Sequence, residues 1–369
     1  MSVAAQRPDF DRPVMIMAGG TGGHVFPALA VARVLRDRGV AVVWLGAPAS
    51  MESRLVPANG FRIEWIRVRG IRGKGLLAWL RAPLSILNAV RQAVAVLRRV
   101  RPRAVLGAGG YVSGPGGIAA WLLRIPLLIH EQNAIPGLTN RALARLAVEV
   151  LEAFPGSFRA SLHARTVGNP VREDIAAMPD PAVRFAGRSG PARLLVFGGS
   201  QGAQRLNVMV PQALARISSD RRPRVRHQAG ERGFEAARAA YQDAAVEAEV
   251  IPFIEDMAAA YAWADVAVCR AGAMTIAELQ AAGLGALLVP LPGATDDHQR
   301  KNAQAMAATG AARVLQERDM TAESLSACIA DLSADRDRML RMAEASRRMR
   351  IIDAATRVAD LCLAAGAPA

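Results

Sequence analysis

Residues 13–38 read PVMIMAGGTGGHVFPALAVARVLRDR, and this stretch decides the fold class. The apolar run Pro13–Ala18 predicts a buried strand, a glycine-rich turn follows, and Pro27–Arg38 has the apolar spacing of a helix. A strand, a turn and a helix in this order make the first half of a βαβ unit. The chain is therefore expected to form a parallel sheet with helices on both faces.

The same succession of elements recurs along the chain and sets the domain organisation. The predicted strands are Val40–Leu45, Phe61–Val68, Ala104–Leu106, Pro126–Ile129, Arg193–Phe197, Ala264–Cys269 and Ala286–Leu291, and further helices are predicted at Pro83–Val100 and about Met274–Ala282. The pattern restarts at Arg193, after Gly and Pro interrupt it in Thr166–Arg172. We therefore expect an α/β fold of two Rossmann-like, doubly wound parallel-sheet domains, residues 12–168 and 169–350.

The composition agrees with two folded domains and excludes several classes of protein. The 369 residues are 52% hydrophobic and 21% charged, which disordered chains are not. Three scattered cysteines, Cys269, Cys328 and Cys362, fit neither a zinc site nor a disulfide framework, so a reducing, cytoplasmic setting is expected. Residues 1–12 contain no signal core, and no apolar run reaches the ~20 residues of a membrane span. If the protein meets a membrane, we expect it to lie on the surface.

Charge divides the chain into a basic half and a neutral half. Residues 1–170 carry the entire net charge of +14, whereas residues 171–369 hold 24 basic and 24 acidic side chains. Between Glu64 and Glu131 there are ten Arg, one Lys and no acidic residue. Such a surface favours phosphate groups, nucleic acid or an anionic membrane. No nucleic-acid partner is expected, because aromatic residues make up only 5% and no recognition motif is present.

Two glycine-rich loops lie in the first half. Gly19–His24 (GGTGGH) separates a predicted strand from a helix, where backbone N–H groups and the helix dipole attract an anion. It is not the dinucleotide fingerprint, since Val25 stands where the third Gly belongs, and it is not a Walker loop. A tight turn without a ligand is the alternative. Gly107–Gly117 has six glycines in eleven residues, which we interpret as close approach to a ligand or a flexible rim and not as core.

A third loop, Gly198–Gly202 (GGSQG), has two interpretations. It matches the G-x-S-x-G elbow of serine hydrolases, which would require a later acid and then a later His. The later histidines are His227 and His298, and Asp297 lies too close to His298 for the usual order. A Ser at the start of a helix also serves as a cap or binds phosphate.

Polar residues follow three other predicted strands, in the segments His130–Asn133 (HEQN), Cys269–Glu278 (CRAGAMTIAE) and Asp296–Asn302 (DDHQRKN). Open α/β sheets bind ligands at the carboxyl ends of their strands. Glu278 falls about one turn into its helix. Its carboxylate could accept hydrogen bonds from a ribose diol, or it could be an ordinary surface group.

Six motifs, in their order along the chain, resemble one protein family. GGTGGHVFPALA, GAGGYVSGPGG, HEQNAIPGLTN, GNPVR, FGGSQGA and CRAGAMTIAEL are similar to segments of the MurG family, the peripheral UDP-N-acetylglucosamine (UDP-GlcNAc) transferases of peptidoglycan synthesis. The resemblance runs from about Val14 to about Ala364. It implies the GT-B architecture, in which two Rossmann-like domains face a cleft. It also implies that a last helix, at about residues 351–366, packs back on the first domain.

The resemblance also implies a reaction and its partners. GlcNAc would move from UDP-GlcNAc to the 4-hydroxyl of MurNAc in undecaprenyl-pyrophosphoryl-MurNAc-pentapeptide, with inversion to a β-1,4 link. The first domain would face the acceptor and the membrane, and the second would bind UDP-GlcNAc. The enzyme would work at the cytoplasmic face of the bacterial inner membrane, with cell-wall and cell-division proteins as candidate partners. No cofactor and no metal at the reaction centre would be needed.

Carried over by position, the resemblance assigns residues to the donor. In the first domain Thr21, Gly22 and Gly23 would line its diphosphate and sugar, and Asn133 would contact the sugar. At and beyond the domain boundary Arg172 would lie beside the donor, Ser200 would cradle the phosphates, Ile254 would meet the uracil through its backbone, and Gln299 would bind GlcNAc hydroxyls. The nucleoside floor would be Ala273, Met274, Thr275, Ile276, Ala277 and Glu278, with Glu278 on the ribose. The sequence departs from the family at Asp297-His298, where another Gln or an Asn is often found.

Inversion by single displacement needs a base for the acceptor hydroxyl and stabilisation of the leaving UDP. We predict His24 as the base, because a helix N-terminus disfavours imidazolium and keeps the ring able to accept a proton. Glu131 is the second candidate. Helix N-termini, Ser200 and Arg172 would meet the leaving diphosphate.

A basic amphipathic stretch is the candidate membrane surface. Its apolar side chains could enter the interface while Arg and Lys meet anionic headgroups, at ~1 kcal/mol per charge. The predicted membrane-facing residues are Ile71, Arg72, Lys74, Leu76, Leu77, Trp79, Leu80 and Arg81. Packing of this face on the protein's own core is the alternative.

The sequence therefore leaves three candidate functions, which we rank. A glycosyltransferase comes first, a serine hydrolase with Ser200 as nucleophile second, and a non-catalytic nucleotide- or phospholipid-binding protein third.

Overall fold

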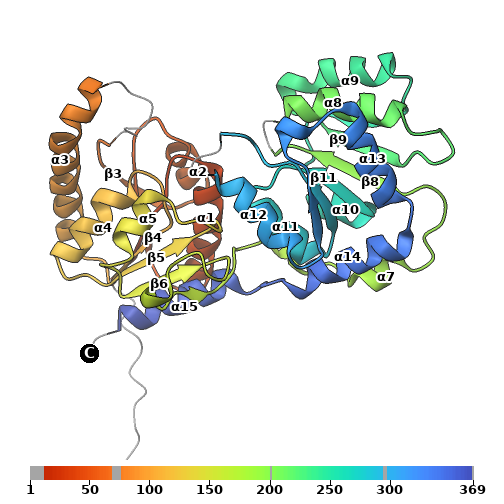
Figure 1. Ribbon diagram of the computed structural model, residues 1–369. Helices are drawn as coiled ribbons and strands as arrows, with labels where there is room; N and C mark the ends of the chain where they lie inside the picture. Colours follow the sequence, from red (N-terminus) through yellow and green to blue (C-terminus); the bar gives the residue numbers. More distant parts are fainter. Residues whose placement is uncertain (1–11, 69–75, 200–201, 294–296, 368–369) are drawn as a thin grey trace, which may run out of the picture. The chain divides into compact units, whose positions relative to one another are not determined.

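The computed structural model describes residues 12–68, 76–199, 202–293 and 297–367, with the backbone alone at residues 76–82 (Figure 1). The chain forms two compact units. Unit 1 consists of Met1–Pro170 together with Asp353–Ala369, and unit 2 consists of Val171–Ile352.

Unit 1 is built on a seven-stranded parallel sheet with the order β3-β2-β1-β4-β5-β6-β7. Its strands are β1 (Val14–Met17), β2 (Val42–Gly46), β3 (Arg62–Trp65), β4 (Ala104–Gly107), β5 (Leu127–Glu131), β6 (Glu149–Glu152) and β7 (Arg165–Thr166). The strand order reverses between β1 and β4. The loops after these two strands therefore flank the switch point, where open α/β sheets bind ligands.

Helices cover both faces of this sheet. One face carries α1 (Gly22–Asp37), α2 (Glu52–Ala58) and α15 (Ala354–Ala365), and the other carries α3 (Leu76–Val100), α4 (Ser113–Leu122) and α5 (Leu138–Leu143). Successive side chains of β1 point to opposite faces of the sheet. Ile16 therefore packs in the core on the α1 side, and Met17 packs in the core on the α3 side. At the end of the chain, α15 adds Val358 and Cys362 to the core shared with α1 (Figure 1).

Unit 2 repeats the plan with six parallel strands in the order β10-β9-β8-β11-β12-β13. Its strands are β8 (Arg193–Phe197), β9 (Arg224–Gln228), β10 (Glu249–Ile251), β11 (Val266–Cys269), β12 (Gly285–Leu288) and β13 (Ala312–Val314). The core on one face is shared with α8 (Gln204–Ala215), α9 (Phe234–Asp243), α13 (Ala322–Ser333) and α14 (Arg336–Arg348). The remaining longer helices are α10 (Met257–Trp263), α11 (Ala273–Ala282) and α12 (His298–Ala307), and two short ones, α6 (Glu173–Ala176) and α7 (Pro181–Phe185), precede β8. No helix in the described part of the chain is long and apolar enough to cross a membrane.

The predicted α/β class is confirmed, and several element boundaries differ from the prediction, among them the start of α3 at Leu76 and not at Pro83. Helix α1 begins at Gly22, before the predicted start at Pro27, and Pro27 lies inside the helix. Strand β5 runs on to Glu131, because His130 and Glu131 pair with Leu151 and Glu152 of β6. Strand β12 ends at Leu288, two residues before Pro290, which has no N–H to continue a ladder.

The glycine-dense segment 107–117 is partly core, so the prediction that it serves only a ligand or a rim is wrong. Helix α4 begins inside it, at Ser113. A Cβ on Gly116 would lie 2.2 Å from Sδ of Met17, and one on Gly117 would lie 2.6 Å from Cδ1 of Leu143. These two glycines let α4 pack closely against the sheet and against α5.

A buried polar network ties β9 to α8 and α9 in unit 2. The His227 ring is 1% exposed, with Nε2 3.1 Å from Oδ1 of Asn207 and Nδ1 3.0 Å from the hydroxyl of Tyr241. Asn207 also donates from Nδ2 to the carbonyl of Ala229 at 2.9 Å. Burial lowers the pKa of His227 to about 3, so the ring is neutral in the folded protein.

This network predicts an acid-sensitive unit 2. Unfolded histidine binds a proton below pH ~6.5 whereas folded His227 does not, so stability falls as the pH drops from 6.5 toward 3. At pH 5 the loss from this residue should reach about 2 kcal/mol relative to pH 8. Urea unfolding at both pH values measures it, and His227→Gln should remove that part of the pH dependence. His163→Asn, at an exposed histidine with φ of +47°, is the matched control and should leave it unchanged. If the free energy of unfolding of His227→Gln depended on pH as steeply as that of the wild type, His227 would not be the source of the acid sensitivity.

Candidate active site

The loops after β1 and β4 pack backbone against backbone at the switch point of unit 1. Gly110 has φ of +82°, and a Cβ there would lie 2.2 Å from the carbonyl oxygen of Gly19. From α2, the fully buried Glu52 accepts hydrogen bonds from the N–H groups of Gly20 at 3.1 Å and Ala47 at 3.2 Å. The first glycine loop is thus fixed by a glycine contact and by a carboxylate.

This loop leads into the first turn of α1, where the predicted residues Thr21, Gly22, Gly23 and His24 lie together. Thr21 is the exposed N-cap, and its hydroxyl makes no capping hydrogen bond to α1. The positive end of the helix dipole and the early N–H groups of α1 are therefore presented at the switch point. Half-buried His24 projects from this turn, and a Cβ on Gly109 would lie 2.8 Å from its ring.

The segment His130–Asn133 is divided between the two faces of the sheet. On the α1 side, His24 Nδ1 lies 2.9 Å from Oε1 of Gln132, and Nε2 of Gln132 lies 3.3 Å from Nδ1 of His130. His130 Nε2 donates to the carbonyl of Gly168 at 2.9 Å. Burial lowers the pKa of His130 to about 4, so this ring is neutral near pH 7.

Glu131 points to the other face and organises the loop that follows β5. It is 1% exposed. One oxygen accepts from N and Nδ2 of Asn133 at 3.0 and 3.1 Å, and the other accepts from N of Gly137 at 3.0 Å and Nδ2 of Asn140 at 2.9 Å. Because both oxygens are occupied in this way, the geometry favours a structural role for Glu131 over that of a base.

The sequence GNPVR spans the boundary between the units. Gly168 receives the hydrogen bond from His130, and Asn169 donates from Nδ2 to the carbonyl of Gln132 at 2.9 Å. Arg172, the second residue of unit 2, is the N-cap residue of α6.

In unit 2, Arg172, Glu278 and Tyr261 form one cluster. The Tyr261 hydroxyl donates to Oε2 of Glu278 at 2.9 Å, and the Arg172 guanidinium lies 3.6 Å from Oε1. Burial raises the pKa of Glu278, while Arg172 and the tyrosine hydrogen bond act to lower it. Burial, and then the charge of Glu278, raise the pKa of Tyr261, which stays a neutral donor. The predicted position of Glu278, one turn into its helix, is confirmed, since α11 begins at Ala273.

Two amide side chains of α12 hold the loop between β11 and α11. Gln299 Oε1 accepts hydrogen bonds from the N–H groups of Ala271 at 3.2 Å and Leu291 at 2.9 Å. Fully buried Asn302 donates from Nδ2 to the carbonyl of Ala271 at 3.2 Å. With its oxygen used in this way, and with no partner for Nε2 in the part of the chain that the structure describes, Gln299 can offer the N–H groups of Nε2 to a ligand.

The remaining predicted residues lie in unit 2, near the carboxyl ends of its strands, or in segments of either unit whose side chains are not described. Ile254 is buried in the loop between β10 and α10, and Ala273–Ala277 form the first turn of α11. Ser200, Ile71, Arg72 and Lys74 lie outside the described residues, and at Leu76, Leu77, Trp79, Leu80 and Arg81 only the backbone of α3 is described.

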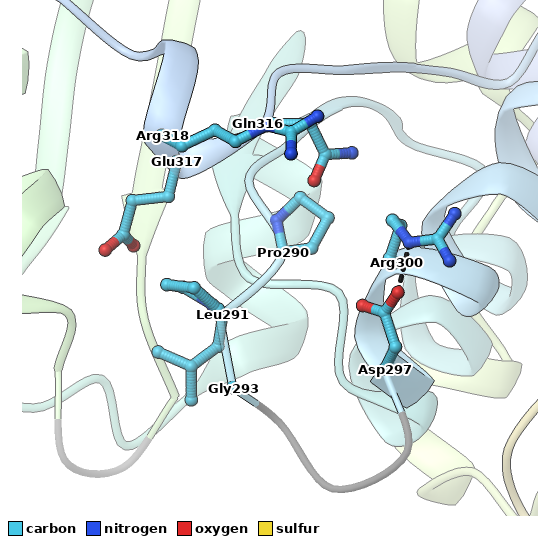
Figure 2. Close-up of a pocket in the computed structure, with 9 residues that line it drawn as sticks. Pro290, Leu291, Gly293, Asp297, Arg300, Gln316, Glu317 and Arg318 are labelled. Carbon is cyan, nitrogen blue, oxygen red and sulfur yellow. Dashed lines mark hydrogen bonds and ion pairs between the residues drawn. The ribbon is translucent and has the colours of Figure 1, made fainter.

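A cavity of about 450 Å³ adjoins this loop system in unit 2. Figure 2 shows its lining, which comes from the segment after β12, from α12 and from the segment after β13. Arg270, 8% exposed, donates to the carbonyl of Val289 at 3.1 Å and pairs with Glu317, so it joins two of these segments. In Figure 2, Arg300 and Asp297 form an ion pair on one wall. Leu291, on another wall, is the residue whose N–H is bound by Gln299.

Several important residues were not predicted from the sequence. Glu52 and Tyr261 act on loops far from them in the chain, and no local pattern marks them. Gln132 could have been found, because it follows the end of β5 two residues after His130 and continues the alternation of that strand. The hydrolase interpretation gains no support, since both ring nitrogens of His227 are used inside the core. Among the described residues, no group of three or more His, Cys, Asp or Glu side chains could hold a metal ion.

Both units are similar to domains of known proteins. Residues 14–152 match the glycosyltransferase family 28 N-terminal domain, and residues 193–358 match its C-terminal domain. The crystal structure of Acinetobacter baumannii MurG superposes with a TM-score of 0.86 at 42% identity, covering 95% of this chain and 99% of that one. The calicheamicin glycosyltransferase CalG4 is similar in fold alone, with a TM-score of 0.66 at 18% identity over 96% of this chain and 98% of that one.

Curated relatives are similar over almost their whole length. The chain is 57% identical over 350 residues to the UDP-N-acetylglucosamine--N-acetylmuramyl-(pentapeptide) pyrophosphoryl-undecaprenol N-acetylglucosamine transferase of Nitrosococcus oceani, covering 95% of this chain and 98% of the relative. The enzyme of the same name from Alkalilimnicola ehrlichii is 57% identical over 353 residues, covering 95% and 98%.

Two Rossmann-like units with polar loops at the carboxyl ends of their strands, together with these structural neighbours, define a glycosyltransferase of the GT-B fold. The chain belongs to glycosyltransferase family 28 and, within it, to the MurG family. The resemblance of the six motifs is thereby confirmed.

The contacts of Glu131 predict a loss of stability on substitution. In Glu131→Gln, an amide N–H would face backbone and side-chain donors, leaving buried groups unpaired at a cost of about 2 kcal/mol or more. Thermal unfolding and faster hydrogen exchange of the Gly137 amide measure the loss. Glu149→Gln, at a partly exposed ion pair with Arg165 on the neighbouring strand, is the control and should change stability by less than about 0.5 kcal/mol. Unchanged exchange combined with lost turnover would favour Glu131 as the base instead.

Proposed function

We propose that this chain transfers GlcNAc from UDP-GlcNAc to the 4-hydroxyl of MurNAc in undecaprenyl-pyrophosphoryl-MurNAc-pentapeptide. The observation that carries the proposal is the 57% identity over 350 residues to an enzyme of that name, which extends through both units. The product is the β-1,4-linked lipid-linked disaccharide used in peptidoglycan synthesis.

His24 is the base of the proposed reaction. Its Nε2 removes the proton of the acceptor hydroxyl as the oxygen attacks the anomeric carbon, and the bond from that carbon to the diphosphate breaks on the opposite face. The hydrogen bond from Nδ1 to Gln132 supports this role, because it holds the ring, and Nε2 has no hydrogen-bond partner among the described residues. Thr21, Gly22, Gly23 and Asn133 are proposed to line the donor in unit 1.

Unit 2 is proposed to bind the nucleotide and to stabilise the leaving UDP. The carboxylate of Glu278, fixed by Tyr261, is suited to accept hydrogen bonds from ribose hydroxyls. Residues Ala273–Ala277 and the backbone of Ile254 would hold the uridine. Arg172, Ser200 and helix N-termini would stabilise negative charge on the diphosphate. The free N–H groups of Gln299 would reach GlcNAc hydroxyls.

We place the enzyme on the cytoplasmic face of the bacterial inner membrane, with unit 1 against the lipid. Support comes from α3, where residues 83–88 are exposed on all sides of the helix. Leu84 and Leu87 are 72% and 57% exposed, and Trp121 at the end of α4 is 51% exposed. Exposed Arg91, Arg98 and Arg99 lie farther along α3 and suit anionic headgroups. Cell-wall and cell-division proteins remain proposed partners.

The proposed reaction predicts acceptor-dependent release of UDP. Purified protein with UDP-GlcNAc and a lipid-linked MurNAc-pentapeptide analogue should release UDP and form a GlcNAc–MurNAc product, and omission of the acceptor should abolish both. His24→Gln should lower kcat by roughly 100-fold or more, because proton transfer to a positioned base contributes on that scale.

His163→Asn provides the control histidine variant and should keep full activity. Release of UDP without any acceptor would indicate hydrolysis, and full turnover by His24→Gln would remove His24 as the base.

The membrane proposal predicts that polar substitutions on the exposed part of α3 weaken binding to anionic lipid vesicles. Leu84→Gln combined with Leu87→Gln should weaken binding to vesicles containing anionic lipid by roughly 10-fold, because two apolar side chains no longer enter the interface. Sedimentation with vesicles measures the change. Val183→Gln, at a 67% exposed position in unit 2, is the control and should bind as before. Strong binding to neutral vesicles that high salt does not weaken would contradict the electrostatic part of the proposal.

A further inference from the structure

Four groups of unit 1 form a continuous hydrogen-bonded line that ends at His24. The carbonyl of Gly168 lies 2.9 Å from Nε2 of His130, and Nδ1 of that ring lies 3.3 Å from Nε2 of Gln132. The other end of the Gln132 amide, Oε1, lies 2.9 Å from Nδ1 of His24. Gln132 and His130 are 1% and 2% exposed, so water does not compete for these bonds.

The position of each proton follows from the carbonyl at the start of the line. A carbonyl accepts only, so Nε2 of His130 carries a hydrogen. Burial lowers the pKa of His130 to about 4, which leaves one hydrogen on the ring and makes Nδ1 an acceptor. Nε2 of Gln132 donates to that Nδ1, and it also donates to the carbonyl of His130 at 3.1 Å.

The orientation of the Gln132 amide then determines the tautomer of His24. Because Nε2 of Gln132 faces His130, its Oε1 faces His24 and accepts a hydrogen bond. In neutral His24 the hydrogen is therefore on Nδ1, and the lone pair is on Nε2. The opposite tautomer would set two lone pairs against each other at 2.9 Å.

We propose that Gln132 and His130 are positioning residues that hold His24 as its Nδ1–H tautomer, so that Nε2 is the atom that takes the acceptor's proton. The proposal rests on the proposed function, in which His24 is the base. The proton moves from the acceptor hydroxyl to Nε2, and the oxygen electron pair forms the new bond to the anomeric carbon. The electrons of the broken bond leave with UDP. Gln132 and His130 touch neither substrate nor reacting atom.

Packing around the His24 ring supports a fixed orientation. The ring lies against Gly109, where even a methyl group would come within 2.8 Å of Nδ1 and Cε1. Asn140 donates to the carbonyl of His130 at 3.1 Å, and Asn169 donates to the carbonyl of Gln132 at 2.9 Å. The backbone that carries both positioning residues is thus held from two sides.

The test reads the tautomer directly and does not need activity. Nitrogen-15 spectra of histidine-labelled full-length protein, at a pH where His24 is neutral, distinguish a protonated from an unprotonated ring nitrogen. His24→Gln identifies the His24 signals among those of the five histidines. We expect a protonated Nδ1 and an unprotonated Nε2. The reverse pattern would overturn the proposal without any further variant.

Variants then separate positioning from general stability. Gln132→Met removes all three hydrogen bonds of the amide while keeping an unbranched side chain. It should give a mixture of tautomers and lower kcat by roughly 10- to 100-fold, with KM for UDP-GlcNAc within about twofold of the starting value.

Two substitutions of His130 provide the matched pair. His130→Gln keeps a group that donates to Gly168 and accepts from Gln132, and should preserve the tautomer and most of kcat. His130→Phe keeps the ring volume without these bonds and should behave like Gln132→Met. Wild-type tautomer and kcat in Gln132→Met or in His130→Phe would overturn the proposal. If no variant or wild-type protein releases UDP with acceptor, the proposed function fails while the spectra still decide the tautomer.

Discussion

The candidate active-site half of unit 1 depends on the two-residue alternation of β5. Even-numbered residues face α1, as Leu128 does, and odd-numbered residues face α4 and α5, as Ile129 does. The polar residues that end this strand obey the same rule, so one short motif supplies two unrelated networks. His130 and Gln132 reach His24, while Glu131 turns away and gathers the N–H groups of the next loop. A one-residue shift of register would exchange these roles and leave buried polar groups unpaired on both faces.

Glycine contacts set the distance between the loops that meet at this point. Gly110, in the left-handed region, lies against the carbonyl of Gly19, and Gly116 lies against Met17 one turn into α4. Any side chain at these positions would separate the β1 and β4 loops or lift α4 from the sheet. With the backbone held so closely, the first turn of α1 and His24 are placed before a substrate arrives. Fixed dipoles and a fixed base are effective because they need no rearrangement during the reaction.

Sequence patterns predicted the fold class and the three strand, glycine loop and helix units because those signals are local. Five of the strands that the structure describes were missed. Of these, β7 (Arg165–Thr166), β10 (Glu249–Ile251) and β13 (Ala312–Val314) have too few residues to show alternation, and β6 (Glu149–Glu152) and β9 (Arg224–Gln228) carry charged residues that hide their strand pattern. The function of Glu52 was also hidden, because its partner Gly20 is 32 residues away and pairing depends on how α2 packs. At Gly107–Gly117 composition misled, since glycines that admit a ligand and glycines that admit a neighbouring helix look alike in sequence. The end of β5 was set two residues early because polar residues suggested a loop, although β6 continues the ladder there.

Some polar loops of the two units are held by different chemical groups, and the amides of unit 2 suit the charge of the proposed leaving group. In unit 1, buried carboxylates accept hydrogen bonds from the loops: Glu52 accepts from the N–H of Gly20, and Glu131 accepts from the loop after β5. In unit 2, neutral amides hold two of the loops that follow the strands: Gln299 accepts a hydrogen bond from Ala271, and Gln228 donates to the carbonyl of Gly199 at 2.9 Å. Amides add no negative charge beside loops proposed to receive a diphosphate, so the field of the backbone N–H groups remains available to it. The carboxylate of the proposed nucleotide site, Glu278, is balanced by Arg172.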